Sequence, residues 1–381
     1  MPVATPAAFR SRFPLLAGTV HLASCSLGPP SDALGEAMDR MGRWLTDAVL
    51  PWELWMAEVE QARERFARLI NAAPHEVAVI PSATVGAYQV AATTDWSARP
   101  GLVGTTSDYP SVAQVWLAQR PRGAAVDYVR EGDGGVPPSH YLDRIDERTA
   151  LVSIPLVSYV TGGRMPVREV VTAAHEVGAR VFVDAYQAAG VLPIDVRELG
   201  CDYLVSGAMK YLLGLPGIAF LYVRDGVKDD LPPQLTGWYG RSNPLAFDPS
   251  ALDFPDDARR FQVAMPTFPA ALAANAGLQL LEGLDIAAVD AHVDRLVTYA
   301  IGRLGEIGAR LQSPIADGVR GPQIAVQDDA PRMTAAWLEA RRIFLARGNV
   351  LRFSFHYFND ESDVDAACRA LGEYRSVPDR T

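Results

Sequence analysis

Short apolar runs alternate with amphipathic helical patterns through the first two-thirds of the chain, and few folds accommodate that order. Runs rich in β-branched residues are typical of strands that are buried on both faces of a parallel sheet. Parallel strands need crossover connections, which helices usually supply, so the pattern predicts an α/β fold. The predicted strands are Val77–Ile80, Leu102–Thr105, Ala125–Val129, Ala150–Leu156, Arg180–Val183, Tyr203–Ser206 and Ile218–Val223.

Helical patterns lie between and around these strands, and a proline-rich polar stretch from Leu231 to Asp257 interrupts them. We therefore expect a large domain over residues 31–245, with a seven-stranded, mostly parallel sheet. A smaller α/β domain is expected over residues 246–381, with strands at Gln323–Val326 and Val350–Phe355. The predicted helices are Pro51–Asn71, Val85–Thr94, Ser111–Gln119, Val167–Val177, Ala270–Glu282, Ala287–Leu311, Met333–Arg342 and Glu361–Gly372.

Composition argues against several classes of partner. The formal charge of −10 over 381 residues leaves no basic surface with which to bind nucleic acid. No run approaches the roughly 20 apolar residues that a membrane span needs, and the N-terminus does not resemble a secretory signal. Three scattered cysteines and six histidines without close pairs suggest neither disulfides nor a metal site. We expect a cytoplasmic protein without nucleic-acid or membrane partners.

Lysine is nearly absent from the chain. The 35 Lys and Arg residues include only two lysines, Lys210 and Lys228, which leaves 33 arginines. Lys228 lies in a polar run, whereas Lys210 lies in an apolar stretch bounded by glycines, residues 207–214. Arginine can replace lysine as a surface charge, but only lysine can form a Schiff base with an aldehyde. Lys210 is therefore a candidate for pyridoxal phosphate chemistry; the alternative is a lysine whose ammonium group lies in water.

Asp184 follows the apolar run Arg180–Val183, where a carboxylate is costly unless it has a partner. The pyridine nitrogen of pyridoxal phosphate is such a partner, because an adjacent carboxylate keeps it protonated. A helix-capping role for Asp184 is the alternative. Gln187 lies one turn later and could reach the ring hydroxyl from the same side.

Two further strand ends carry polar or aromatic residues. Residues 81–86 follow a predicted strand and open a helix, so their N–H groups could bind a phosphate or simply form a helix cap. Asp108-Tyr109-Pro110-Ser111 also opens a helix, and Tyr109 could stack on a flat cofactor or pack into the core. Ligands of open α/β sheets bind at these carboxyl ends.

The order of these motifs resembles the class V aminotransferase family, which includes cysteine desulfurases, kynureninases and isopenicillin N epimerase-like proteins. The likeness extends from His21-Leu22-Ala23 to the stretch Leu351–Asn359 and covers nearly the whole chain. The resemblance implies a fold-type I pyridoxal phosphate enzyme that is a homodimer with its active site at the subunit interface. The most specific segments are Val183–Gly190, Leu192–Asp195, Asp202-Tyr203, Ser206-Gly207 and Pro216–Val223.

The resemblance also implies roles for the residues around the cofactor ring. Lys210 would hold the cofactor as an internal aldimine, and Asp184 would pair with the ring nitrogen. Gln187 would lie near the ring oxygen. Tyr109 matches the aromatic residue or histidine that lies over the ring in relatives, and Tyr159 would face the cofactor as in kynureninases.

Other positions match phosphate- and substrate-binding residues of the family. Ala83 and Thr84 would bind the phosphate through backbone and hydroxyl, with Ser206 helping from below. Arg352 would hold the substrate α-carboxylate; independently, strand alternation places it on the polar side of Val350–Phe355, where an exposed arginine is the alternative. The segment Trp238-Tyr239 resembles aromatic residues of kynureninase-like sites, which makes Trp238 a candidate for the cofactor and Tyr239 for the substrate.

The sequence departs from the family in two informative places. Met209 precedes the lysine, where many relatives have histidine or tyrosine. No cysteine lies between Arg310 and Arg352, where desulfurases carry the nucleophile that forms a persulfide. Cys25 lies in a segment that approaches the substrate in relatives, so residues 1–30 are expected to contribute to the site, although Cys25 itself favours a packing role.

The expected substrate is a small α-amino acid that reacts through an external aldimine and a quinonoid. β-Elimination of the carbon–sulfur lyase type, without a persulfide cysteine, is favoured because the relatives that the chain most resembles act at the β-carbon. Transamination and epimerisation use the same groups and remain alternatives. A non-catalytic scaffold is the alternative from another class, but a degenerate site should lose its buried charges first.

Overall fold

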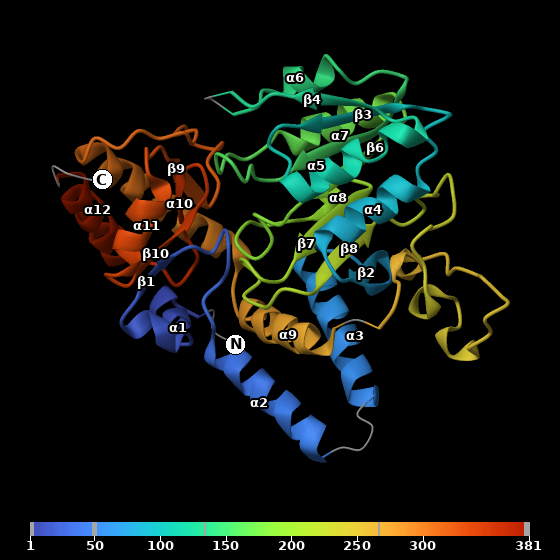
Figure 1. Ribbon diagram of the computed structural model, residues 1–381, viewed down its shortest axis with the longest axis horizontal. Coiled ribbons are helices and arrows are strands. Elements are labelled where there is room, and N and C mark those ends of the chain that lie inside the picture. The colour runs from blue at the N-terminus through green and yellow to red at the C-terminus, as the bar shows by residue number, and fades with distance from the viewer. Residues whose placement is uncertain (1–3, 48–51, 133–134, 266, 377–381) are drawn as a thin grey trace.

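The computed structural model describes residues 4–47, 52–132, 135–265 and 267–376. The large sheet has seven strands in the order β2-β8-β7-β6-β5-β3-β4, and only β8 runs antiparallel to its neighbours (Figure 1). This result confirms the predicted seven-stranded, mostly parallel sheet. The strands are β2 (Val77–Ile80), β3 (Gly101–Thr105), β4 (Ala125–Val129), β5 (Thr149–Pro155), β6 (Arg180–Asp184), β7 (Tyr203–Gly207) and β8 (Ala219–Val223).

Helices cover both faces of this sheet, as the apolar strands require. In β6, Val181 and Val183 join the core that includes α3 and α7, whereas Phe182 packs on the other face with α4 and α5. Side chains of a strand alternate between faces, so a strand that is apolar throughout must be covered twice. These helices are α3 (Trp52–Leu69), α4 (Ala83–Thr93), α5 (Pro110–Leu117), α6 (Pro138–Leu142), α7 (Val167–Glu176) and α8 (Val196–Leu199).

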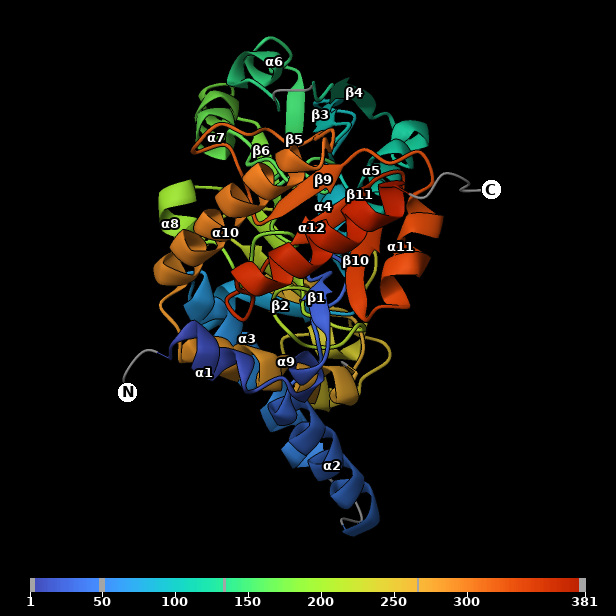
Figure 2. The ribbon, with the colours of Figure 1, turned by 90° about the vertical axis from the view of Figure 1, so that its left-hand side faces the viewer.

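A second sheet of four strands lies at the centre of the small domain, in the order β1-β10-β11-β9. Its strands are β1 (Val20–Leu22), β9 (Gln323–Val326), β10 (Ile343–Arg347) and β11 (Leu351–Ser354). Figure 2 shows the helices α10 (Ile286–Glu306), α11 (Pro331–Glu339) and α12 (Glu361–Ser376) on the outer side of this sheet.

Two of these strands were not predicted. β1 has only 3 residues, too few for a recognisable alternation. α11 ends at Glu339, earlier than the predicted Arg342, and Arg342 itself adopts a left-handed conformation with φ 60° in the turn that directly precedes β10. β1 pairs in parallel with β10, so the N-terminal segment completes the small sheet.

The N-terminal segment and the helix α9 (Phe268–Glu282) each connect the two domains. α9 packs against α3 and against α2 (Asp32–Asp47), a helix that was not predicted, while the short α1 (Pro6–Arg10) precedes β1. The division at residues 30 and 245 remains a prediction. Among the described residues, no single helix is long and apolar enough to cross a membrane; α9 and α10 pass that test only together, across an 86° bend.

Candidate active site

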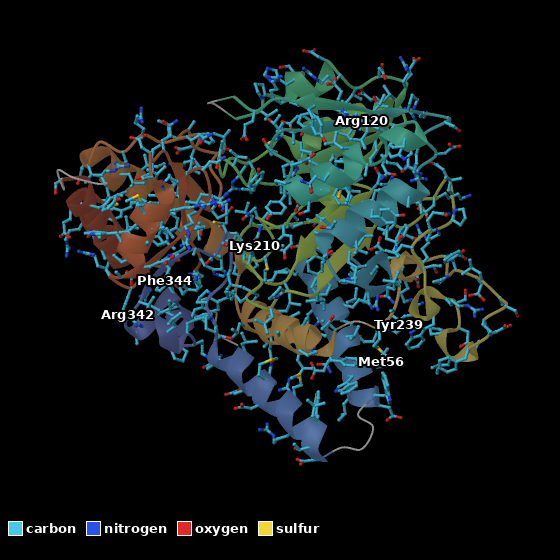
Figure 3. The ribbon with its side chains drawn as sticks, in the orientation of Figure 1. Met56, Arg120, Lys210, Tyr239, Arg342 and Phe344 are labelled. Carbon is cyan, nitrogen blue, oxygen red and sulfur yellow. The ribbon has the colours of Figure 1, made fainter. Side chains whose placement is uncertain are left out.

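Lys210 lies beyond the carboxyl end of β7, on the side of the large domain that faces the small domain (Figure 3). The residue is 7% exposed, which contradicts the alternative of an ammonium group in water. Burial, partly offset by the charge of Asp184, lowers the pKa of Lys210 to about 8. The amine is therefore neutral much more often than that of a surface lysine, as a nucleophile requires.

Asp184 is the last residue of β6, which is adjacent to β7 in the sheet. One carboxylate oxygen, Oδ1, accepts a hydrogen bond of 2.8 Å from the backbone N–H of Tyr186. Burial raises the pKa of Asp184, while the Tyr186 N–H and the charge of Lys210 oppose that shift. A carboxylate in this position favours a protonated partner over water.

A cavity of about 240 Å³ opens at these strand ends. The first N–H groups of α4 belong to Ala83 and Thr84, and such groups have no partner within a helix. Ser82 caps this helix by accepting the Val85 N–H at 3.3 Å. The cavity therefore offers N–H donors at a helix N-terminus, which suit a phosphate. The predicted residues that line it are Lys210, Asp184, Gln187, Ala83, Thr84, Tyr109 and Tyr159.

Two predicted residues lie next to this cavity without lining it. Ser206 is buried in β7, and its hydroxyl donates to the Gly207 carbonyl at 3.4 Å. Arg352 lies on β11, and its Nη1 donates to the Tyr159 carbonyl at 2.9 Å, which joins the small domain to the wall of the cavity. The positive charge of Arg352 acts on both Lys210 and Tyr159.

Trp238 and Tyr239 do not line the cavity among the described residues of their own chain, so their roles at the cofactor and the substrate stay predictions. Figure 3 shows Tyr239 on the far side of the large domain from Lys210. The Tyr239 hydroxyl donates to Glu60 of α3 at 3.4 Å, and Trp238 borders a separate surface hollow with Phe247. A role for this pair requires a second copy of the chain.

The structure adds Glu131, which the sequence analysis missed, to the surroundings of the site. Its carboxylate accepts hydrogen bonds from Ser107 (2.5 Å), Ser158 (2.8 Å) and Thr161 (2.5 Å). Ser107 belongs to the loop that ends in Tyr109, and the other two residues flank Tyr159. No local motif marks such a residue, because folding alone brings these hydroxyls together.

Replacement of Glu131 by alanine is expected to lower the free energy of unfolding by about 2 kcal/mol, because three hydroxyls lose a charged acceptor. Urea denaturation of the two proteins measures this difference. Glu147→Ala, at an exposed position, is the control and should leave the midpoint unchanged. Equal midpoints for Glu131→Ala and the parent would show that Glu131 does not tie the two loops together.

Unsatisfied polar atoms in the site fit a cofactor and an anionic substrate. Gln187 is 5% exposed, and its Nε2 donates to the Cys25 carbonyl, while Oε1 has no partner among the described residues. Nε of Arg352 is likewise buried and unpaired in the part of the chain that the structure describes. Leaving such atoms unpaired is costly, so a ring hydroxyl beside Gln187 and a carboxylate beside Arg352 would be stabilising.

The three cysteines of the chain are buried, and the thiols of Cys201 and Cys368 differ in how strongly burial shifts their pKa. Within residues 4–47, 52–132, 135–265 and 267–376, no group of three or more His, Cys, Asp and Glu residues could hold a metal ion. Cys25, Cys201 and Cys368 are all buried. Burial raises the pKa of Cys201 to about 12 and that of Cys368 to about 11, so neither is a ready nucleophile.

Comparison with known proteins identifies the family. The family model described as aminotransferase class-V matches residues 52–367. The uncharacterized aminotransferase YcbU of Bacillus subtilis is 34% identical over 364 residues, 94% of this chain and 95% of that protein. A kynureninase of Deinococcus radiodurans is 28% identical and is matched over 79% of this chain and 74% of its own length.

The fold agrees with that of a solved structure. An apo cysteine desulfurase from Thermococcus onnurineus NA1 superposes with a TM-score of 0.86 at 20% identity, over 98% of this chain and 99% of that chain. The chain therefore belongs to the class V aminotransferase family and is a pyridoxal phosphate-dependent enzyme of fold-type I.

Proposed function

We propose that the enzyme catalyses β-elimination from a small α-amino acid that carries a leaving group, such as a thiolate, on its β-carbon. With an S-substituted cysteine the net reaction consumes one water and yields pyruvate, ammonia and a thiol. The C–S bond breaks, the α-proton leaves Cα, and the sulfur gains a proton. Bound pyridoxal phosphate supplies an aldehyde for Lys210 and an electron-poor ring that stabilises negative charge at Cα.

Each step of this reaction is assigned to a residue in the cavity or beside it. Arg352 holds the α-carboxylate and so orients the amino acid. Lys210 removes the α-proton, for which a lowered pKa suits its amine. Asp184 keeps the ring nitrogen protonated, and the N-terminus of α4 at Ala83 and Thr84 holds the phosphate.

The position of Tyr159 in the cavity is the observation that favours elimination. Elimination needs an acid near the leaving group, and this side chain lines the cavity beside Arg352. Burial raises the pKa of Tyr159, the positive charge of Arg352 opposes this shift, and Tyr109 and Glu131 add to it, so the phenol keeps its proton at neutral pH. The buried cysteines support the same choice, because a persulfide-forming reaction needs an accessible thiolate.

Product analysis tests the proposal. The holoenzyme is incubated with S-substituted cysteines and with unsubstituted amino acids, and pyruvate, ammonia and free thiol are measured. Equal amounts of the three products from the cysteine conjugates support elimination, and Tyr159→Phe should then slow thiol release. Absence of thiol from every substrate overturns it.

Transamination is the second candidate, since the YcbU relative is named an aminotransferase. It predicts that the amino group stays on the cofactor and that a 2-oxo acid forms without ammonia or thiol. A second 2-oxo acid would then be needed to regenerate the starting enzyme. The same incubation therefore separates the two reactions.

We also propose a cytoplasmic homodimer whose cavities lie at the subunit interface. Leu245, Phe247 and Leu252 are 72%, 70% and 65% exposed, and all belong to the segment between residues 231 and 257. Large apolar side chains that gather on one segment favour burial against another chain. This segment also carries Trp238-Tyr239, and sedimentation equilibrium tests for the dimer.

Removal of Arg352 is expected to raise KM for the amino acid about fiftyfold, which corresponds to a loss of about 2–3 kcal/mol from a charged hydrogen-bonded pair. Arg352→Leu is compared with Arg347→Leu, an exposed arginine of the adjacent strand β10. Steady-state kinetics gives KM and kcat separately. An unchanged KM for Arg352→Leu would exclude a role in binding the carboxylate.

The rate at which apo protein takes up pyridoxal phosphate is expected to rise with pH and to level off above about 8. Only a neutral amine attacks an aldehyde, and burial lowers the pKa of Lys210 to about 8 from its ordinary 10.5. Stopped-flow absorbance between about pH 6.5 and 9.5 follows this uptake. A rate that continues to rise steeply above about pH 9 would contradict the lowered pKa.

A further inference from the structure

Two tyrosines lie close to the amine of Lys210. The Nζ atom is 4.3 Å from the centre of the Tyr186 ring and 5.3 Å from that of Tyr109, and both side chains line the cavity. Tyr109 matches an aromatic position of the family, whereas Tyr186 was not predicted to contact the cofactor. An aldehyde that reaches Lys210 must pass close to both rings.

Tyr186 is also tied to the carboxylate of the site. Its backbone N–H donates to Asp184 at 2.8 Å, so one short turn sets the position of both residues. Burial raises the pKa of the Tyr186 phenol, and the charge of Asp184 raises it further. The side chain therefore stays neutral and provides an aromatic surface without a second negative charge.

Gly207 makes room for this ring. A Cβ atom built on Gly207 would lie 2.2 Å from both Cζ and the hydroxyl oxygen of Tyr186, which no real side chain tolerates. The φ angle of Gly207 is not in the left-handed region, so its backbone alone does not require glycine. Because Gly207 has no side chain, Tyr186 can lie directly against the end of β7. Gly207 is the last residue of that strand and precedes Lys210 by three residues.

We propose that Tyr186, held against Gly207, provides an aromatic face for the cofactor ring in addition to that of Tyr109. Ring stacking at this point fixes the plane of the ring relative to Asp184, which contacts its nitrogen, and to Lys210, which contacts its aldehyde. This role rests on the cofactor position proposed above. It does not depend on the reaction type, since elimination and transamination need the same ring orientation.

Cofactor binding provides the test, because it is independent of turnover. In a Lys210→Ala background, which removes covalent attachment, pyridoxal phosphate is titrated into each apo variant and its visible circular dichroism is recorded. Tyr186→Ala is expected to weaken binding about tenfold and to diminish the dichroic band. Tyr186→Phe keeps the face and should match the parent, and Tyr88→Ala, an exposed tyrosine of α4, is the control.

Gly207→Ala provides a second, independent test of the same proposal. The new methyl group displaces the Tyr186 ring, so this variant should bind the cofactor as weakly as Tyr186→Ala does. In the double variant Tyr186→Ala/Gly207→Ala the clash is gone, and binding should be no weaker than in Tyr186→Ala alone. Unchanged affinity and dichroism in Tyr186→Ala, a defect in Tyr186→Phe equal to that of Tyr186→Ala, or fully additive losses in the double variant would each overturn the proposal.

These results are distinguishable from failure of the proposed function. A parent protein that binds no pyridoxal phosphate would refute the cofactor position itself. Tight binding with products other than thiol would refute only the elimination reaction and would leave the Tyr186 comparison intact. Should Gly207→Ala fail to fold, the two Tyr186 variants still decide the outcome.

Discussion

Lys210→Ala is expected to lower turnover by roughly a thousandfold or more and to abolish covalent attachment of the cofactor. The substitution removes both the amine that condenses with the aldehyde and the base that takes the α-proton. No other lysine could replace it, because the only other lysine of the chain, Lys228, lies in the polar run Arg224–Asp230. Loss of the visible band of the bound aldehyde and loss of product formation measure the two roles.

The scarcity of lysine makes a direct control possible. Borohydride reduction of the holoenzyme fixes the cofactor to its lysine, and peptide mass spectrometry then identifies the residue. We expect the mass on the peptide that contains Lys210, with Lys228→Ala behaving as the parent in band and turnover. A reduced adduct on Lys228, or a band that survives Lys210→Ala unchanged, would refute the assignment.

Most strands of the large sheet were predictable because they are buried at nearly every position; the edge strand β4, which is largely exposed or half-buried, is the exception. β4 and β2 begin and end where the sequence predicted, and each of the others differs by one residue at one end or, for β5, at both ends. A strand covered on both faces is apolar at every position, which leaves a clear pattern in the chain. β10 shows the limit: only three residues separate Ile343–Arg347 from the end of α11 at Glu339, and periodicity does not mark a boundary that lies in so short a turn.

The site was predictable where a residue follows its strand directly. Asp184 is the last residue of β6, while Ala83 follows β2 and Tyr109 follows β3 within a few residues. The carboxyl ends of these strands lie at the same edge of the sheet, so topology alone brings the three residues together. The roles of Trp238 and Tyr239 stay predictions, because these residues belong to a long connection that does not reach the cavity of the same chain. Glu131 was missed because its three partners come from two separate loops.

Asp184→Asn is expected to lower turnover roughly a hundredfold or more while leaving a folded protein that still binds the cofactor. The amide has the shape of the carboxylate but no charge, so the ring nitrogen is no longer held in its protonated form. Initial rates with the holoenzyme measure the loss, and the visible spectrum verifies that the cofactor is present. Asp143→Asn, at an exposed position, should retain full activity.

Asp184→Asn should lower turnover but should not lower the stability of the apo protein. This difference separates a role in catalysis from a role in folding. Burial raises the pKa of Asp184 above its ordinary value, so the folded state binds the proton more tightly than the unfolded state does. Stability contributed by this group therefore decreases as pH rises through the interval between the unfolded and folded pKa values, and Asn removes that decrease. We expect thermal unfolding of apo Asp184→Asn at neutral pH to occur at or above the parent temperature. A variant that is inactive and also much less stable would mean that Asp184 serves the fold rather than the cofactor ring.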